Sequence, residues 1–287
     1  MRSIDRFKGC LLGGAVGDAL GYAVEFQNLI RSESSTDPRV LHMNDNYILG
    51  VRLRESPDKG SYLNSLPVVK HLSQAEGLSF SKPVTFFVGE NGTGKSTLLE
   101  ALAVASVFNP EGGSRMFMFS TRDSHSELHR LITTVKTVSP EDGFFLRAES
   151  FYNVASYLDE VERSNPRGPF NFYGGVPLHE QSHGEAFLSL VLHRFSGKGL
   201  YLLDEPESAL SPQKILNLIC AIDDLVKRDS QFIIATHSPI LMAYPKSQIL
   251  QFSDDGIHEV AYRDTEHYRL TRQVLDAPER MMKFLLE

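Results

Sequence analysis

A glycine-rich loop between an apolar strand and an apolar helix restricts the possible folds of this chain more than any other feature. Residues 89–96 match the pattern G-x-x-x-x-G-K-[ST] at every fixed position. Residues 84–88 before the loop form an apolar run typical of a buried strand, and residues 95–106 after it have the apolar content of a helix. A strand, such a loop and a helix in that order predict an α/β domain with a mostly parallel sheet.

Each fixed residue type in the loop suits phosphate binding. Glycines let backbone N–H groups close around phosphate oxygens without a Cβ in the way, and the following helix directs the positive end of its dipole at the anion. Lys95 is predicted to reach the β- and γ-phosphates of ATP and the hydroxyl of Ser96 to bind Mg²⁺. The predicted nucleotide-binding residues are Gly89, Glu90, Asn91, Gly92, Thr93, Gly94, Lys95, Ser96 and Thr97.

A second apolar run, at residues 200–203, ends in two carboxylates, Asp204 and Glu205. Ligands of parallel sheets gather at the carboxyl ends of the strands, so this pair is expected beside the loop. Asp204 is predicted to hold Mg²⁺ through water, and Glu205 to orient and polarise the attacking water. Taken by itself, the segment is also compatible with a solvated strand end that carries two acids.

Strand and helix patterns alternate after residue 83. Strands are predicted at residues 84–88, 115–119, 143–147, 200–203 and 232–235, and helices at residues 95–106, 124–137, 150–163, 185–195 and 212–228. An antiparallel strand is predicted at residues 47–53, a closing hairpin at 249–260, and a helical tail from Glu266. The polar, turn-forming residues 28–46 are the best linker candidate in the chain.

Length, charge and cysteine usage exclude several classes of protein. The chain has 287 residues, a net charge of −7 and two cysteines that are far apart. The negative charge argues against a surface that coats nucleic acid, and the cysteines form neither a disulfide framework nor a zinc site. Apolar runs are too short to span a membrane, and glycines interrupt the one at residues 10–16, which makes a poor signal peptide. A soluble, cytoplasmic protein is therefore expected.

Residues 47–287 resemble an ABC-type ATPase, in particular the short AAA-family ATPases without a coiled coil that are related to the SMC-like and OLD-nuclease groups. The segment Gln181-Ser182-His183-Gly184-Glu185 resembles the Leu-Ser-Gly-Gly-Gln signature of that family, with Ser182 and Gly184 matching. The resemblance implies that Ser182 and Gly184 face the γ-phosphate of a second copy, so that the working unit is a nucleotide-sandwiched homodimer. A plain helix N-cap is the alternative for Ser182.

Two further segments carry the resemblance. Residues 207–211 resemble the D-loop, which crosses the dimer interface, with Ser211 in place of the usual acid. Residues 235–239 resemble the segment with the switch histidine, here His237, which would touch the γ-phosphate; a purely structural histidine is the alternative. The family therefore implies catalytic roles for Lys95, Glu205 and His237, and a fold with a P-loop, an antiparallel β edge and a small helical lobe.

The resemblance also has gaps. A Q-loop glutamine is missing after residues 143–147, where Glu149 or Ser150 could substitute. The aromatic residue that stacks on adenine has two candidates, Tyr47 and Tyr62. Long coiled-coil arms are excluded, because the segment between the loop and the signature is too short to hold them.

Residues 1–27 resemble a different family, the opening helix of ADP-ribosylglycohydrolases. The acid clusters with which that family holds two metal ions are missing, and Asp18 alone cannot build a dinuclear site. A remnant of a fusion or frameshift is the favoured interpretation; a docking helix and an active hydrolase are the alternatives.

Two hypotheses remain for the process that hydrolysis drives. The first is a regulator acting on DNA or a partner protein, in genome maintenance or defence. The second is the nucleotide-binding subunit of a membrane transporter, which the short Pro/Gly-rich stretch before Ser182 disfavours, because it leaves little surface for docking. A weakly basic helix region with Arg122, Arg130 and Lys136 is the candidate for DNA contact, although such runs are usually solvated.

Overall fold

The structure, a computed structural model, describes residues 46–75, 77–114, 126–148, 151, 154–156, 160 and 176–287. The chain divides after Asp45 into two units, and the second unit, Asn46–Glu287, contains all the described residues. The predicted segment 1–27 and almost all of the predicted linker 28–46 therefore lie outside the described residues.

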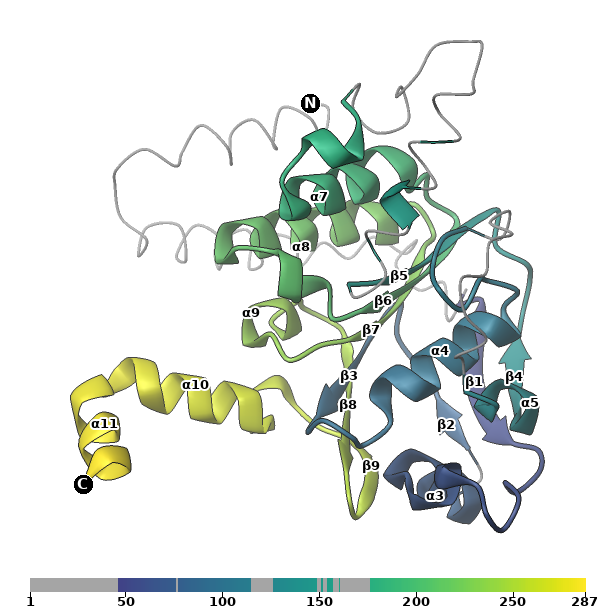
Figure 1. Cartoon of the computed structure of the whole chain (residues 1–287), viewed down its shortest axis with the longest axis horizontal. Coiled ribbons are helices and arrows are strands. Elements are labelled where there is room, and N and C mark those ends of the chain that lie inside the picture. The colour runs from purple at the N-terminus through teal and green to yellow at the C-terminus, as the bar shows by residue number, and fades with distance from the viewer. Residues whose placement is uncertain are drawn as a thin grey trace, which may run out of the picture. The chain divides into compact units, whose positions relative to one another are not determined.

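A six-stranded sheet runs through the second unit (Figure 1). Across the sheet the strands are β5 (Asp142–Arg147), β6 (Gly199–Asp204), β7 (Gln231–Ala235), β3 (Val84–Gly89), β8 (Gln248–Ser253) and β9 (Gly256–Glu259). The first five are parallel, and β9 returns antiparallel to β8. Ala235 of β7 pairs with Phe87 of β3 and with Asp204 of β6, so the carboxyl ends of these three strands lie at one edge.

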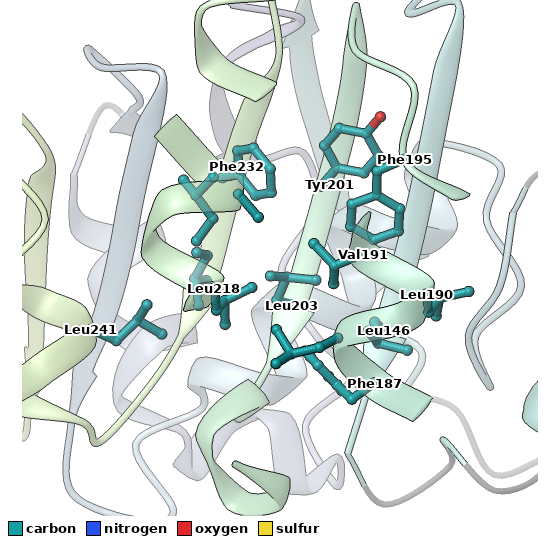
Figure 2. Packing of buried hydrophobic residues seen from close by; sticks show 14 of the residues in the cluster. Leu146, Phe187, Leu190, Val191, Phe195, Tyr201, Leu203, Leu218, Phe232 and Leu241 are labelled. Atoms are coloured by element: carbon teal, nitrogen blue, oxygen red, sulfur yellow. The ribbon is translucent and has the colours of Figure 1, made fainter. Parts of the chain in front are cut away.

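The two faces of the sheet bury different side chains, because successive residues of a strand point to opposite faces. On β6, Tyr201 and Leu203 belong to one buried cluster, and Leu200 and Leu202 belong to the other. Helices α7 (His183–Arg194), α8 (Pro212–Val226) and α9 (Pro239–Met242) contribute to the first cluster. Figure 2 shows Phe195, which directly follows α7, stacked on Tyr201 of β6 in this layer, with ring centroids 4.2 Å apart. Burial on both faces explains why the strands read as continuous apolar runs.

The second face is covered by α4 (Lys95–Ala105) and by a small antiparallel sheet. The small sheet has the order β2 (Leu78–Ser79), β1 (Ile48–Leu53), β4 (Ile132–Lys136), and α3 (Pro67–Gln74) contributes to the same buried cluster. The predicted class, an α/β fold with a mostly parallel sheet and an antiparallel part, is confirmed. Neither α3 nor β2 is predicted from the sequence.

The helix predicted at residues 124–137 is wrong. Within the described part of that range, α5 covers only Leu128–Leu131, and the following residues form β4, whose Ile132 pairs with Leu53 of β1. The run Ile-Thr-Thr-Val at residues 132–135 is β-branched throughout, and such side chains favour strands because their χ1 freedom is restricted in a helix. The prediction of a weakly basic helix region is wrong for the same reason, since Lys136 lies on strand β4.

Most other predicted elements are confirmed within a few residues. The strand predicted at residues 115–119, most of the helix at 150–163 and most of the helical lobe lie outside the described residues. The helical tail consists of α10 (Glu266–Asp276) and α11 (Pro278–Leu286), neither of which buries a residue. In the described part of the chain, no helix is long and apolar enough to cross a membrane.

Candidate nucleotide site

The loop between β3 and α4 depends on glycines at two tight positions. Gly89 and Gly94 have φ angles of 133° and 94°, in the left-handed region that favours glycine. A Cβ on Gly89 would lie 2.2 Å from the carbonyl oxygen of Phe252, and one on Gly94 would lie 2.4 Å from Cγ1 of Val68. Neighbouring segments therefore press on the loop from two sides, which fixes its backbone directly before the first turn of α4.

Lys95, the first residue of α4, lies inside this loop. Its Nζ donates to the carbonyl oxygens of Gly89 at 2.7 Å and Glu90 at 2.8 Å. Burial lowers the pKa of Lys95, while the charges of Glu205 and Asp204 oppose that shift. The structure thus places a buried ammonium group between the loop backbone and the two acids, where a phosphate group can exchange for the loop carbonyls.

The next residue joins the loop to the acid pair. Ser96 Oγ donates to Asp204 Oδ1 at 2.8 Å, across 108 positions of sequence. Arg147, at the end of β5, forms an ion pair with Glu100 of α4 at 2.6 Å and places Nε 3.5 Å from Asp204 Oδ2. The predicted metal ligands Ser96 and Asp204 are therefore brought together.

This donor set suits Mg²⁺. A hydroxyl and a carboxylate supply only oxygen, and Mg²⁺ usually binds through one or two carboxylates together with substrate phosphates rather than in an all-protein cage. No cluster of three or more His, Cys, Asp or Glu side chains arranged for a metal occurs among the described residues. The residues present therefore fit the group that the sequence implies.

Glu205 has an unusual backbone conformation. Its φ and ψ are 50° and 52°, the left-handed region that non-glycine residues adopt at a cost of about 1–2 kcal/mol. Its N–H is held by the carbonyl oxygen of Ala235 at 2.9 Å. The side chain remains 44% exposed, and Oε1 lies 3.7 Å from Nε2 of His237. Strain of this kind is typical of functional sites, and here it accompanies a second acid that lies close to His237.

His237 is held by groups on two other segments. Its backbone N–H donates to Oε1 of Glu207 at 2.6 Å, and its Nδ1 lies 3.0 Å from Nε2 of His267 on α10. Burial, then the charge of Lys95, lowers the pKa of His237, and burial raises the pKa of Glu207. Nε2 of His237 is buried and finds no hydrogen-bond partner within the described residues. The predicted catalytic residues Lys95, Glu205 and His237 therefore lie in one neighbourhood.

Ser182 and Gly184 lie at the start of α7, apart from these groups. Ser182 is the N-cap of α7; its hydrogen-bond partners are Glu185 and Lys214, neither of which belongs to the loop. A Cβ on Gly184 would lie 2.5 Å from the carbonyl oxygen of Ala209, so this glycine lets α7 pack closely on the segment after the acid pair. The capping role is thus seen, and the role in a second copy stays a prediction.

The two candidates for adenine stacking differ. Tyr47 is 8% exposed, and its hydroxyl donates to the carbonyl oxygen of Asp229, at the amino end of β7 and opposite to the loop. The prediction that Tyr47 stacks on adenine is therefore wrong. Tyr62 is 61% exposed and belongs to the 3-10 turn Tyr62–Ser65, close before Val68, whose N–H donates to Thr93 in the loop at 3.3 Å. Tyr62 stays a prediction, while the Q-loop substitutes Glu149 and Ser150 lie outside the described residues.

Three site residues were missed by the sequence predictions. Arg147 ends an apolar strand and pairs in register with Asp204, and Glu100 is a single acid in an apolar helix. A charged residue in such a position is a usable signal for a buried ion pair. His267 lies in an amphipathic tail with no sequence signal that connects it to the loop.

Two family models match the ATPase region. Residues 141–243 match the model described as "AAA domain, putative AbiEii toxin, Type IV TA system", and residues 68–138 match one described as "AAA domain". Residues 1–70 match the model described as "ADP-ribosylglycohydrolase". The described end of that last range includes β1 and the start of α3, which pack within the second unit.

Proteins with similar sequences include ATP-binding proteins of importers. The arabinose import ATP-binding protein AraG of Mannheimia succiniciproducens is 26% identical over 212 residues, which is 67% of this chain and 39% of AraG. The cobalt import ATP-binding protein CbiO of Salmonella typhimurium is 27% identical over 228 residues, which is 72% of this chain and 82% of CbiO. The chain thus spans well under half of AraG.

Similar solved structures include cbiO1 from Clostridium perfringens, with a TM-score of 0.42, 14% identity, and coverage of 85% of this chain and 100% of that one. The SMC head domain from Thermotoga maritima has a TM-score of 0.39, 16% identity, and coverage of 75% and 98%. The geometry of the loop and the acid pair, the two AAA-domain models and the named ATP-binding relatives support ATP hydrolysis by an ABC/AAA-like P-loop ATPase.

Proposed function

We propose that this chain is a cytoplasmic ATPase that works as a nucleotide-sandwiched homodimer and drives a process directed at DNA or a partner protein. The observation that carries the proposal is the hydrogen bond from Ser96 to Asp204, with Lys95 beside it. Two segments that lie far apart in sequence meet there with the residue types that phosphoryl transfer requires.

Each residue has a role that follows from its position. The loop amides and Lys95 would bind the β- and γ-phosphates and stabilise the charge that develops on them. Ser96 and Asp204 would hold Mg²⁺, which supplies neutralising charge to the phosphates when it is bound. Glu205 would orient and polarise the attacking water, and His237 would donate from Nε2 to the γ-phosphate.

The dimer part of the proposal rests on the start of α7. Ser182 is exposed there, and Gly184 allows close packing on Ala209 in the D-loop-like segment. The two segments that would form the interface with a second copy therefore already pack on each other within one chain. Ser182 of the second copy would complete the site at the γ-phosphate.

The cellular process has two candidates. The family model that names a toxin of a Type IV toxin–antitoxin system supports a role in defence, and the dimer of ATPase domains suits action on DNA or protein. The names of the relatives favour the second candidate, the nucleotide-binding subunit of an importer. Co-purification of the native chain with a membrane subunit would decide for the second.

The test is the solution mass of a Glu205→Gln variant, measured by light scattering with and without Mg-ATP. Blocking the water step should trap the ATP-bound form, so the mass should double with ATP, and an added Ser182→Arg should abolish the doubling. Lys95→Ala is the matched control. In the Glu205→Gln background it should remove ATP binding, and in the wild-type background it should lower the rate of phosphate release at least about a hundredfold. A monomeric mass with ATP demonstrably bound would contradict the dimer; ATPase activity retained in Lys95→Ala would contradict the site.

A further inference from the structure

Helix α10, the first of the two helices in the C-terminal tail, contacts His237 of the candidate nucleotide site through the side chain of His267. Nε2 of His267 lies 3.0 Å from Nδ1 of His237, and the two rings are 5.2 Å apart with an angle of 55° between their planes. A contact of that length between two imidazole nitrogens is a hydrogen bond, so one ring donates and the other accepts.

The first turn of α10 is fixed to the segment that follows His237. The hydroxyl of Tyr262 donates to the carbonyl oxygen of Pro239 at 3.0 Å, and the fully buried Thr265 donates from Oγ1 to the carbonyl oxygen of Tyr262 at 2.8 Å. Thr265 is also the N-cap of α10 and accepts from the N–H of Tyr268. His267 is therefore held against His237 by a folded anchor rather than by its own side chain alone.

The surroundings of His237 decide which ring donates. Its Nε2 is buried, has no hydrogen-bond partner in the described residues, and has Oε1 of Glu205 3.7 Å away. A bare Nε2 lone pair would face a carboxylate, whereas an N–H there is attracted to it. The N–H must therefore be on Nε2, which leaves Nδ1 as the acceptor for a proton on Nε2 of His267.

We propose that His267 is a positioning residue that fixes His237 as the Nε2–H tautomer, and so directs a hydrogen-bond donor at the reacting phosphate. The proposal rests on the proposed ATP hydrolysis for its consequence, but the tautomer itself is a property of the chain alone.

Both rings are disposed to be neutral, as a donor–acceptor pair requires. Burial lowers the pKa of His267 and the charge of Lys95 adds to that shift, while Glu266 and Glu90 oppose it. His267 also lies in the first turn of α10, where the positive end of the helix dipole disfavours an imidazolium cation.

The test reads the tautomer directly by ¹⁵N NMR of the full chain labelled at its histidines, with His237 assigned from the spectrum of His237→Asn. The wild type should show a protonated Nε2 and an unprotonated Nδ1 on His237, and His267→Ala should shift His237 to a mixture of tautomers. In parallel, His267→Ala should lower kcat roughly three- to tenfold, the worth of one hydrogen bond, with no change in ATP affinity.

Two variants serve as controls. His267→Gln keeps an N–H donor near the same place and should restore most of kcat and the wild-type tautomer. His258→Ala removes an exposed histidine of β9 and should change neither. A wild-type spectrum with the proton on Nδ1 of His237, or an unchanged tautomer in His267→Ala, would overturn the proposal. Absence of hydrolysis by the wild type would instead contradict the proposed function, and the spectrum would still decide on His267.

Discussion

The two ends of the parallel sheet differ in how completely their polar side chains are hydrogen-bonded. At the amino end, Asp142 accepts from Arg194 at 3.0 Å, from the N–H and hydroxyl of Ser196 at 3.0 Å each, and from the hydroxyl of Tyr201 at 2.8 Å. Close by, the side chain of Gln231 bonds both the N–H and the carbonyl oxygen of Ile48. Asp142 and Gln231 are thus satisfied within the protein, which is the arrangement that stabilises a fold, although Oγ of Ser106 at the end of α4 is buried without a hydrogen-bond partner in the described residues.

At the carboxyl end, the groups are close together but incompletely paired. Nε2 of His237 and Oε2 of Glu207 are buried without a hydrogen-bond partner in the described residues, and Glu205 has left-handed backbone angles. Groups in that condition cost free energy unless a ligand takes them up. The comparison supports the proposal that the amino end of the sheet mainly stabilises the fold, whereas the carboxyl end holds the substrate.

The largest effect is expected for Glu205→Gly, which tests the role of the carboxyl end. Glycine adopts the left-handed conformation without a Cβ penalty, so the free energy of unfolding should rise by about 0.5–1 kcal/mol. Loss of the water-polarising carboxylate should lower kcat about a hundredfold or more. Urea denaturation and phosphate release measure the two effects.

Lys246→Gly is the matched control for that variant. Lys246 also has a positive φ, 60°, but is exposed and lies in the turn between α9 and β8. It should gain a similar stability with unchanged kcat. A loss of stability in Glu205→Gly would mean that this backbone conformation carries no strain.

At the amino end of the sheet, Asp142→Asn should have the opposite effects: it should lower stability and leave kcat unchanged. The amide keeps the shape of the side chain but loses the ion pair with Arg194 and one or more accepted hydrogen bonds, so the free energy of unfolding should fall by about 2 kcal/mol. The kcat of the folded molecule should not change. A variant that unfolds normally but loses ATPase activity would show that the amino end also serves catalysis.

The same contrast explains what could be predicted from the sequence. Loop, acid pair and switch histidine lie at ends of apolar strands, where local pattern reports position, and the structure brings Lys95, Glu205 and His237 together. Partners that are joined only by tertiary packing cannot be matched from local pattern. Arg147 and Glu100 each stand out as a charge in an apolar segment, but nothing in the sequence pairs them, and nothing connects His267 with His237. The β4 error has the same origin, because the pairing of Ile132 with Leu53 decided between helix and strand.

The pH dependence of stability gives the smallest effect and tests the amino end further. Burial alone would raise the pKa of Asp142, but the Arg194 guanidinium and the bonds from Ser196 and Tyr201 hold it below its ordinary value of 3.8. A carboxyl group whose pKa is lower in the folded state contributes stability above the unfolded pKa and loses it as the pH falls through the folded one. The difference in unfolding free energy between the wild type and Asp142→Asn should therefore be constant at neutral pH and narrow below 3.8. Urea titrations of both proteins over this range measure it. A difference that stays constant down to acid pH would show that Asp142 acts through its shape and neutral hydrogen bonds, and that its charge adds nothing to the fold.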